Sequence, residues 1–410
     1  MNPTDTTRRN WLASAALVAG ARLAAAQAPS AANPKYPRNL TKDDVDRWMT
    51  ELSNWGKWGK DDQAGTINLI TPAKRKAAAA LVKEGVCVSA SLDADLPKEG
   101  TTGVPLQSFG GGGGQRGGPG AGGRGAAGPS APGNPEAVGA AAAAGAPPAT
   151  GAPPAAGAAP AGRGRGPGGP ERATWSLSSR PPGPDPRALA AYVVDTISVS
   201  YHGNYTTHLD ALSHMYYKGQ IFNGYPQTSY TDRGAGKNDV MAFKNGIMTR
   251  GVLFDITKLK NVPYLGDNEA IYPEDLEAWE KKAGFKLESG DAMLVRTGRW
   301  LRVKEKGPLD LNRAAPGLYA SCAKWMKERG VAILGSDVVQ DVRPSGVEGV
   351  NQPIHQMALM SLGTPLIDNC DLEALGEAAA QRKRWTFLLT INPLRIPGAT
   401  GGPVNPIATF

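Results

Sequence analysis

Residues 201–214 read YHGNYTTHLDALSH and contain three of the four histidines in this chain of 410 residues. These are His202, His208 and His214, and Asp210 lies between the last two. In an extended segment alternate side chains share a face, so His208 and Asp210 can reach one point. If the chain then turns into a helix, Asp210 and His214 are one turn apart. The spacing therefore predicts a site in which imidazoles and a carboxylate hold a metal ion.

The ligand types narrow the chemistry of this predicted site. Imidazole and carboxylate together suit zinc, manganese or iron. Such an ion leaves a position for water, and zinc can lower the pKa of that water to about 7. The alternative is that the histidines belong to the core or to a surface loop, but three of only four beside an aspartate favour a metal. Ser213 does not indicate a nucleophilic serine, because sequence neighbours rarely form a productive pair and no G-x-S-x-G motif occurs.

The N-terminus has the features of an export signal. Arg8 and Arg9 precede a short apolar stretch and the alanine-rich residues 24–28, a pattern typical of twin-arginine signals. Arg22 interrupts the apolar stretch, which is too short for a permanent membrane anchor. We therefore expect residues 1–28 to direct export to the periplasm through the twin-arginine machinery, leaving no membrane attachment after cleavage. The alternative is a cytoplasmic leader.

A second unusual segment covers residues 109–170 and consists almost entirely of Gly, Ala and Pro. It has few side chains able to fill a core, so the composition predicts a disordered insertion. Its four arginines are widely spaced without aromatic residues between them, which argues against RNA binding.

More than half of the net charge of +8 comes from these two parts of the chain. Residues 1–28 carry +2 and residues 101–170 carry +3, so the remainder carries only +3. This balance predicts no nucleic-acid-binding surface. We expect residues 29–108 and 171–410 to form one domain, with the metal site in the second part.

The remaining pattern alternates between strands and helices, which predicts an α/β domain with mixed sheets and flanking helices. The expected helices cover residues 41–52, 72–83, 273–283, 318–329 and 353–360, and the expected strands cover residues 86–92, 192–201, 251–256, 292–297, 331–336, 365–367 and 385–391. The three cysteines show no ligand spacing, so we expect Cys87, Cys322 and Cys370 to be small core residues.

At this point the chain resembles the cyclase family, which includes bacterial kynurenine formamidase and isatin hydrolase. The family hallmark is H-x-G-T-H-x-D-x-x-x-H, and residues 207–214, THLDALSH, match its latter part. Further matches are Trp58-Gly59, the segment GTINL at 65–69, and GPVNP at 402–406. The resemblance covers residues 54–100 and 173–410. Within the family, the chain is similar to the longer branch.

The resemblance implies a fold and a set of roles. The implied fold is the cyclase-type α/β fold with swivelling β/β/α character, commonly assembled as a homo-oligomer. His208 and Asp210, with His202 or Asn204, would hold a zinc or manganese ion. His214 would be either a further ligand or the general base. The later motifs imply that His355 orients the substrate or moves a proton, and that Asp368 fixes a histidine or binds a second ion.

The implied activity is hydrolysis of an amide, lactam, lactone or ester bond in a small cyclic or aromatic substrate. Two positions differ from the family pattern, because Asn204 replaces the first motif histidine and Asp368 replaces a glutamate. These differences motivate a second hypothesis, a periplasmic small-molecule binding protein derived from such an enzyme. A purely structural metal is the third.

Overall fold

The computed structural model describes residues 35–93, 107–108, 174–180, 192–204 and 206–410. The predicted export signal and the predicted insertion lie outside these residues. The chain divides into two compact units, residues 1–107, 171–174 and 197–410 in the first and residues 108–170 and 175–196 in the second. The first unit contains the histidine segment.

Helices lie at the five expected positions, and those over residues 256–260, 299–306 and 373–382 were not expected. The helices are α1 (Lys42–Glu51), α2 (Pro72–Ala79), α3 (Ile256–Lys260), α4 (Pro273–Ala283), α5 (Arg299–Lys306), α6 (Cys322–Arg329), α7 (Pro353–Gln356) and α8 (Glu373–Arg382). Short 3-10 helices are η1 (Gly65–Leu69), η2 (Phe222–Gly224), η3 (Gln227–Ser229) and η4 (Val240–Phe243), and η5 (Met357–Leu362) is a π-helix that continues α7.

The strands are mostly short. They are β1 (Cys87–Ser89), β2 (Gln107–Ser108), β3 (Thr174–Arg180), β4 (Tyr192–Ser198), β5 (His208–Asp210), β6 (Tyr230–Thr231), β7 (Gly234–Ala235), β8 (Ile247–Asp255), β9 (Ala270–Ile271), β10 (Ala292–Arg296), β11 (Gly317–Leu318), β12 (Ile333–Ser336), β13 (Leu366–Asp368), β14 (Thr386–Ile391), β15 (Gly401–Pro403) and β16 (Ile407–Thr409). Strands β2, β3 and β4 form a separate three-stranded sheet.

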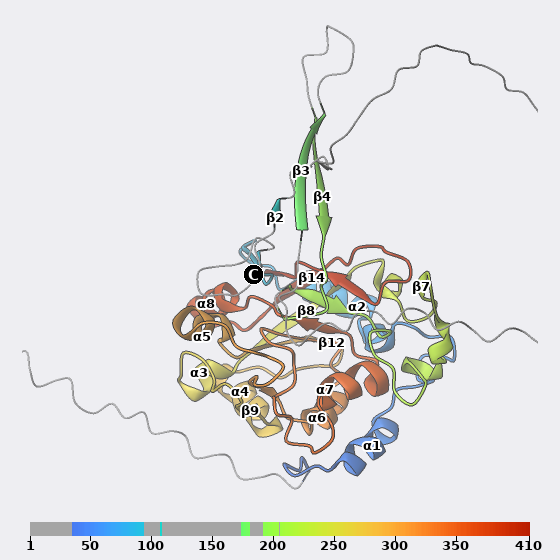
Figure 1. Ribbon diagram of the computed structural model, residues 1–410. Coiled ribbons are helices and arrows are strands. Elements are labelled where there is room, and N and C mark those ends of the chain that lie inside the picture. The colour runs from blue at the N-terminus through green and yellow to red at the C-terminus, as the bar shows by residue number, and fades with distance from the viewer. Residues whose placement is uncertain (1–34, 94–106, 109–173, 181–191, 205) are drawn as a thin grey trace, which may run out of the picture. The chain divides into compact units, whose positions relative to one another are not determined.

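A mixed sheet is the centre of the first unit. Its nine described strands have the order β1-β16-β14-β8-β10-β12-β13-β5-β15. Strands β8, β10, β12 and β13 are parallel, and antiparallel strands flank them on both sides. Strands β10 and β12 are buried along their whole length, as parallel strands covered on both faces usually are. Figure 1 shows α4, α6 and α7 together on one side of β8 and β12.

Local sequence explains where helix α4 begins and ends. Pro273 occupies its first turn, and the Asp275 carboxylate accepts the N–H of Tyr272 at 2.8 Å. The helix ends at Gly284, whose φ of 75° is the left-handed conformation that glycine adopts without strain. Trp279 is buried on its inner face and donates from Nε1 to the carbonyl of Leu253 in β8 at 2.9 Å.

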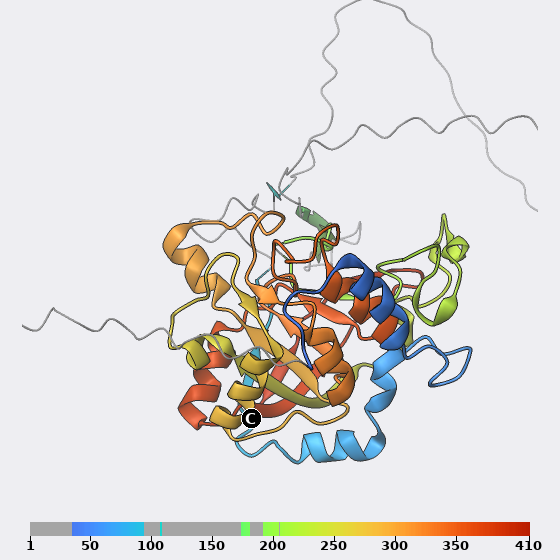
Figure 2. The same cartoon turned by 90° about the horizontal axis from the view of Figure 1, so that it is seen from below.

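The N-terminal segment packs against the helix that follows β12. Figure 2 shows blue α1 beside the orange-red segment that contains α7 and η5. Asn54, just after α1, donates from its backbone N–H to Ser361 and from its side chain to Leu362. The motif at 65–69 forms η1, where Thr66 donates its backbone N–H to the carbonyl of Gly363 at 2.8 Å. These contacts hold the start of the described chain against the segment that carries His355.

The expected α/β fold with a mixed sheet and flanking helices is confirmed. The helix that we allowed for after Asp210 is wrong, because β5 ends there and a turn follows, closed by the N–H of His214 donating to Ala211 at 2.8 Å. The expectation for Cys87 is also wrong, since it lies exposed on the edge strand β1, whereas Cys322 and Cys370 are buried. Among the described residues we find no helical segment with the length and apolar character that crossing a bilayer requires.

Candidate metal centre

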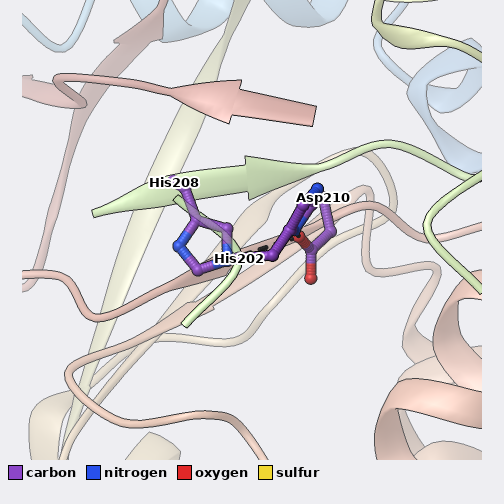
Figure 3. Close-up of side chains that lie close together, drawn as sticks. All are labelled: His202, His208 and Asp210. Carbon is purple, nitrogen blue, oxygen red and sulfur yellow. Dashed lines mark ion pairs between the residues drawn. The ribbon is translucent and has the colours of Figure 1, made fainter. Parts of the chain in front are cut away.

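The site is built on β5, near one edge of the mixed sheet. His208 and Asp210 are alternate residues of this strand and project from the same face. On the neighbouring strand β13, Asp368 lies directly opposite His208. The pleat of the sheet therefore places the two carboxylates and the imidazole on one face. Figure 3 shows this for His208 and Asp210 of β5.

Strand β15 lies on the other side of β5, and a glycine in it makes room for the ring of His202. Gly401 is paired with Asp210, and a Cβ added at Gly401 would lie 2.1 Å from the carbonyl oxygen of Leu209 and 3.0 Å from Cε1 of His202. Only glycine lets the His202 ring approach at this position. The ring is held from its other side, where Nε2 lies 3.0 Å from the hydroxyl of Thr400.

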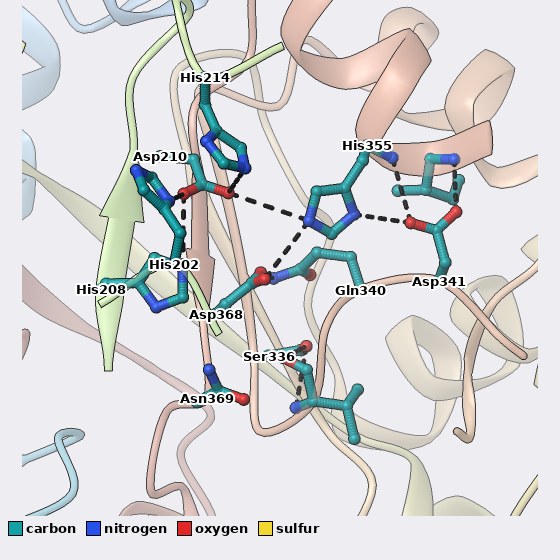
Figure 4. A network of polar contacts seen from close by, with 12 residues as sticks. His202, His208, Asp210, His214, Ser336, Gln340, Asp341, His355, Asp368 and Asn369 are labelled. Carbon is teal, nitrogen blue, oxygen red and sulfur yellow. Dashed lines mark hydrogen bonds and ion pairs between the residues drawn. The ribbon is translucent and has the colours of Figure 1, made fainter. Parts of the chain in front are cut away.

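Four imidazoles surround the carboxylate of Asp210. Nδ1 of His202 and Nε2 of His208 lie 2.8 and 3.4 Å from Oδ1. Nε2 of His214 and Nε2 of His355 lie 4.0 and 3.9 Å from Oδ2. The chain's four histidines thus converge on one aspartate (Figure 4).

The Asp210 carboxylate is the strongest sign of a cation site. It is 1% exposed, and neither oxygen accepts a hydrogen bond of normal geometry from the described residues, although Nδ1 of His202 lies 2.8 Å from Oδ1. Burial would favour its neutral form, but the imidazoles of His214 and His208 hold its pKa well below the usual range. A buried, charged carboxylate without hydrogen bonds is costly unless a cation lies beside it. The donor atoms fit a metal ion on these grounds.

Two sets of three residues present ligand atoms close enough to share an ion. One set is His202, His208 and Asp210, and the other is Asp210, His355 and Asp368; within each set the ligand atoms lie within 4.8 Å of one another. Asp210 belongs to both sets. Nitrogen and oxygen donors in these numbers suit a divalent metal.

His208 is oriented by the main chain before it. Its Nδ1 lies 2.8 Å from the carbonyl oxygen of Thr206, so Nδ1 carries a proton and Nε2 faces Asp210. Burial opposes protonation of the ring, but the nearby Asp210 carboxylate outweighs it and raises the pKa of His208 to about 9 without a metal. An ion bound at Nε2 would replace that second proton.

The His214 side chain is partly exposed to solvent, as is that of His202 at 24%. The side chain of His214 is 28% exposed, and its ring stacks on His202 with centroids 3.8 Å apart. Burial lowers the pKa of His214 despite the opposing charge of Asp210, so the ring is neutral at pH 7. A neutral and partly exposed imidazole can accept a proton from water or substrate.

His355 is held by a carboxylate that the sequence did not single out. The Asp341 side chain accepts the N–H of Ile354 at 2.6 Å and lies 2.7 Å from Nδ1 of His355. Nε2 of His355 is thereby turned toward Asp368, 3.3 Å away. Asp368 also accepts a hydrogen bond from Nε2 of Gln340 at 2.9 Å. Burial is outweighed by Asp368 and Asp341, which raise the pKa of His355 well above its ordinary value.

The structure brings His202, His208, Asp210, His214, His355 and Asp368 together, and their individual roles stay predictions. Asn204 enters the surrounding network through its main-chain carbonyl, which accepts a hydrogen bond from Arg299 at 2.5 Å. A surface cavity of about 630 Å³ is lined by Asn312, Arg313 and the loop around residues 343–352, and none of the predicted site residues lines it.

Comparison with known proteins agrees with this geometry. A sequence model of the family described as "Putative cyclase" matches residues 150–340. This chain is similar to the cyclase family over the matched residues. The crystal structure of a novel cyclase is 26% identical to it, with a TM-score of 0.62, and covers 88% of this chain and 100% of that one. The search of curated proteins gave no match.

Two further solved structures are more distantly similar to this chain. Isatin hydrolase A from Labrenzia aggregata, bound to benzyl benzoate, is 20% identical, with 59% of this chain and 86% of that chain covered and a TM-score of 0.42. A structure described as a predicted metal-dependent hydrolase from Bacillus stearothermophilus is 17% identical, with 57% and 86% covered and a TM-score of 0.34.

Proposed function

We propose that this chain is a metal-dependent hydrolase of an amide, lactam, lactone or ester bond in a small cyclic or aromatic substrate. The observation that carries the proposal is the Asp210 carboxylate, which is buried and charged at the centre of four imidazoles. The match of residues 150–340 to the cyclase family model supports it. The choice of bond and substrate rests on the family resemblance.

His202, His208 and Asp210 would hold a zinc or manganese ion, and Asp368 with His355 could complete a second position beside it. When bound, such an ion polarises a substrate carbonyl and lowers the pKa of water to about 7. The two sets share Asp210, so the carboxylate would hold both positions at once.

The chain's own residues would then manage the protons. His214 is neutral and partly exposed, so it can take a proton from the attacking water. When only the first metal position is filled, Asp341 holds Nδ1 of His355 and leaves Nε2 facing the carboxylate pair, where it can hold a proton and deliver it to the leaving group. The geometry supports His214 as the base and His355 as the positioned acid.

The first test is the metal content of the mature protein, measured by mass spectrometry beside a His208→Ala, Asp210→Ala double variant. We expect one or two zinc or manganese ions per chain, lost in the double variant. A screen of lactones, lactams and formamides with the loaded protein then identifies the bond. Absence of metal after reconstitution with both ions would refute the proposal. A bound compound recovered unchanged after long incubation would instead favour the binding-protein hypothesis.

We also propose that the protein is exported and assembles as a homo-oligomer. The paired Arg8 and Arg9 support export, and the family resemblance supports self-association. Replacing both arginines by lysine should leave the protein in the cytoplasm, as fractionation would show. Light scattering after gel filtration measures the assembly, and a monomer at micromolar concentration would contradict the second part.

A further inference from the structure

Two side chains from outside the histidine segment hold the loop between His202 and His208. Nδ2 of Asn369, just after β13, donates to the carbonyl of Gly203 at 2.6 Å and to that of Thr206 at 3.2 Å. Nη2 of Arg299, at the start of α5, donates to the carbonyl of Asn204 at 2.5 Å. Three carbonyls of a loop that connects two candidate ligands are therefore bound by these two residues.

Arg299 also sets the orientation of Asn369. Its Nη1 donates to Oδ1 of Asn369 at 2.7 Å and to the carbonyl of Asp337 at 3.2 Å. Because the guanidinium only donates, the amide oxygen of Asn369 must face it and the amide nitrogen must face the loop. Arg299 is 2% exposed and Asn369 is fully buried, so water does not compete for these bonds.

The first turn of α5 is fixed as well. The buried Asp337 carboxylate accepts the backbone N–H groups of Thr297, Gly298 and Arg299 at 2.9 to 3.2 Å. These bonds fix the backbone of Arg299. The planar guanidinium, which is bonded at both Nη1 and Nη2, then has little rotational freedom.

The hydrogen bonds continue to the metal ligand. The carbonyl of Thr206 accepts from Asn369 on one side and from Nδ1 of His208 on the other. A carbonyl acceptor at Nδ1 keeps the proton on that nitrogen and leaves Nε2 as the ligand atom toward Asp210. A shift of this carbonyl would rotate the His208 ring or let its proton move from Nδ1 to Nε2.

The main chain of Asn369 also bonds to Thr207, the residue just before β5. Its carbonyl accepts from the hydroxyl of Thr207 at 2.6 Å, and that hydroxyl accepts the N–H of Leu92 at 2.9 Å. Asn369 has a φ of 57°, a left-handed conformation that asparagine tolerates better than most residues. The amide can therefore be removed by glycine without adding backbone strain.

We propose that Arg299 and Asn369 are positioning residues of the metal centre, which select the His208 tautomer and set the distance between His202 and His208. The proposal rests on the proposed function, since it assumes that His208 is a ligand. Neither residue belongs to the two candidate ligand sets. They act through the carbonyls of Gly203, Asn204 and Thr206.

The test compares Asn369→Gly and Arg299→Gln with Arg302→Gln. Arg302 is a matched control, because it is also a buried arginine of α5 and bonds Asp267 at 2.8 and 2.7 Å instead of the histidine loop. Zinc affinity of the full chain is measured by competition with a chromophoric chelator, and melting temperature is measured without metal. Loss of such an outer partner should weaken zinc binding about 10–100-fold.

A second measurement separates positioning from general stability. In zinc-bound protein with 15N-labelled histidine, only four imidazoles contribute signals. We expect a protonated Nδ1 for His208 in the wild type, protected from solvent exchange, and an exchange-broadened or lost signal in Asn369→Gly. Arg302→Gln should lower the melting temperature but keep this signal and bind zinc within about twofold of the wild type.

Wild-type zinc affinity in Asn369→Gly, or an equal loss in Arg302→Gln, would overturn the proposal while leaving the hydrolase assignment in place. A wild-type chain that binds neither zinc nor manganese would overturn both. If Arg299→Gln does not fold, Asn369→Gly decides alone, because it keeps the main-chain bonds of residue 369.

Discussion

Replacing Asp210 by asparagine tests the electrostatics of the site directly. Asparagine keeps the size and shape of the side chain but removes the charge around which the imidazoles gather. In metal-free protein that charge is the main factor that overcomes burial and raises the pKa of His208 to about 9. The substitution should therefore return this pKa to 6.5 or below.

The magnitude follows from the two pKa values. Between 6.5 and about 9, each pH unit contributes about 1.4 kcal/mol, so His208 stabilises the metal-free fold by at most about 3 kcal/mol. The folded state binds the extra proton more tightly than the unfolded state. The stabilisation is therefore complete below pH 6.5 and disappears as the pH rises through 9.

The assay is urea unfolding of both proteins with a chelator at several pH values between 6 and 9.5. We expect the free energy of unfolding of the wild type, relative to Asp210→Asn, to fall by up to about 3 kcal/mol across this window. The raised pKa of His355 comes from Asp368 and Asp341 acting against burial. Both proteins keep these two carboxylates, so most of the His355 contribution cancels in the difference.

Parallel pH profiles for the two proteins would refute this reasoning, because Asp210 would then not control the protonation of His208. A larger stability for Asp210→Asn at pH 6 would also contradict it. Zinc added at pH 7.5 should stabilise the wild type by about 2.7 kcal/mol at one hundred times its Kd and leave Asp210→Asn unchanged.

Three other predictions follow from single contacts. Asp341→Asn should lower kcat about 100-fold or more, since His355 loses the partner that orients it; kcat close to the wild type would exclude that role. Gly401→Ala should cost about 1–3 kcal/mol in urea unfolding, because its Cβ meets Leu209, whereas Gly402→Ala, with nothing within 4 Å, is the neutral control. Burial raises the pKa of Glu373 to about 7 despite its bond with Arg296, so this group should make the fold less stable as pH rises from 4.5 to 7. Glu373→Gln should remove that slope in unfolding measured at pH 5 and 7.5, and an unchanged slope would contradict the assignment.

Much of the local structure was predictable from short-range signals. Helix α4 begins and ends where expected, because Pro273, Asp275 and Gly284 act through contacts within a few residues. Helix α1 begins after Thr41, whose hydroxyl accepts the N–H of Asp44 in a capping box. The turn after Asp210 was not predictable in the same way, since helix and turn both bring His214 back toward the carboxylate.

Partners that lie far apart in the chain were beyond such signals. Asp341 lies 14 positions before His355, and no helix or strand periodicity links the two residues. Arg299 acts on Asn204 from 95 positions away, and Gly401 makes room for a ring 199 positions earlier. Each of these contacts exists only because separate strands and helices meet at one edge of the sheet.

The sequence by itself determined that this chain has a candidate metal site, because His208 and Asp210 share a face of any extended segment and histidine is rare elsewhere. It also determined the α/β character, since periodicity and caps act over a few residues. Only the tertiary structure decided which histidines join Asp210 and which residues hold them. Ligand convergence depends on strand pairing and burial across the whole sheet, and those interactions are long-range.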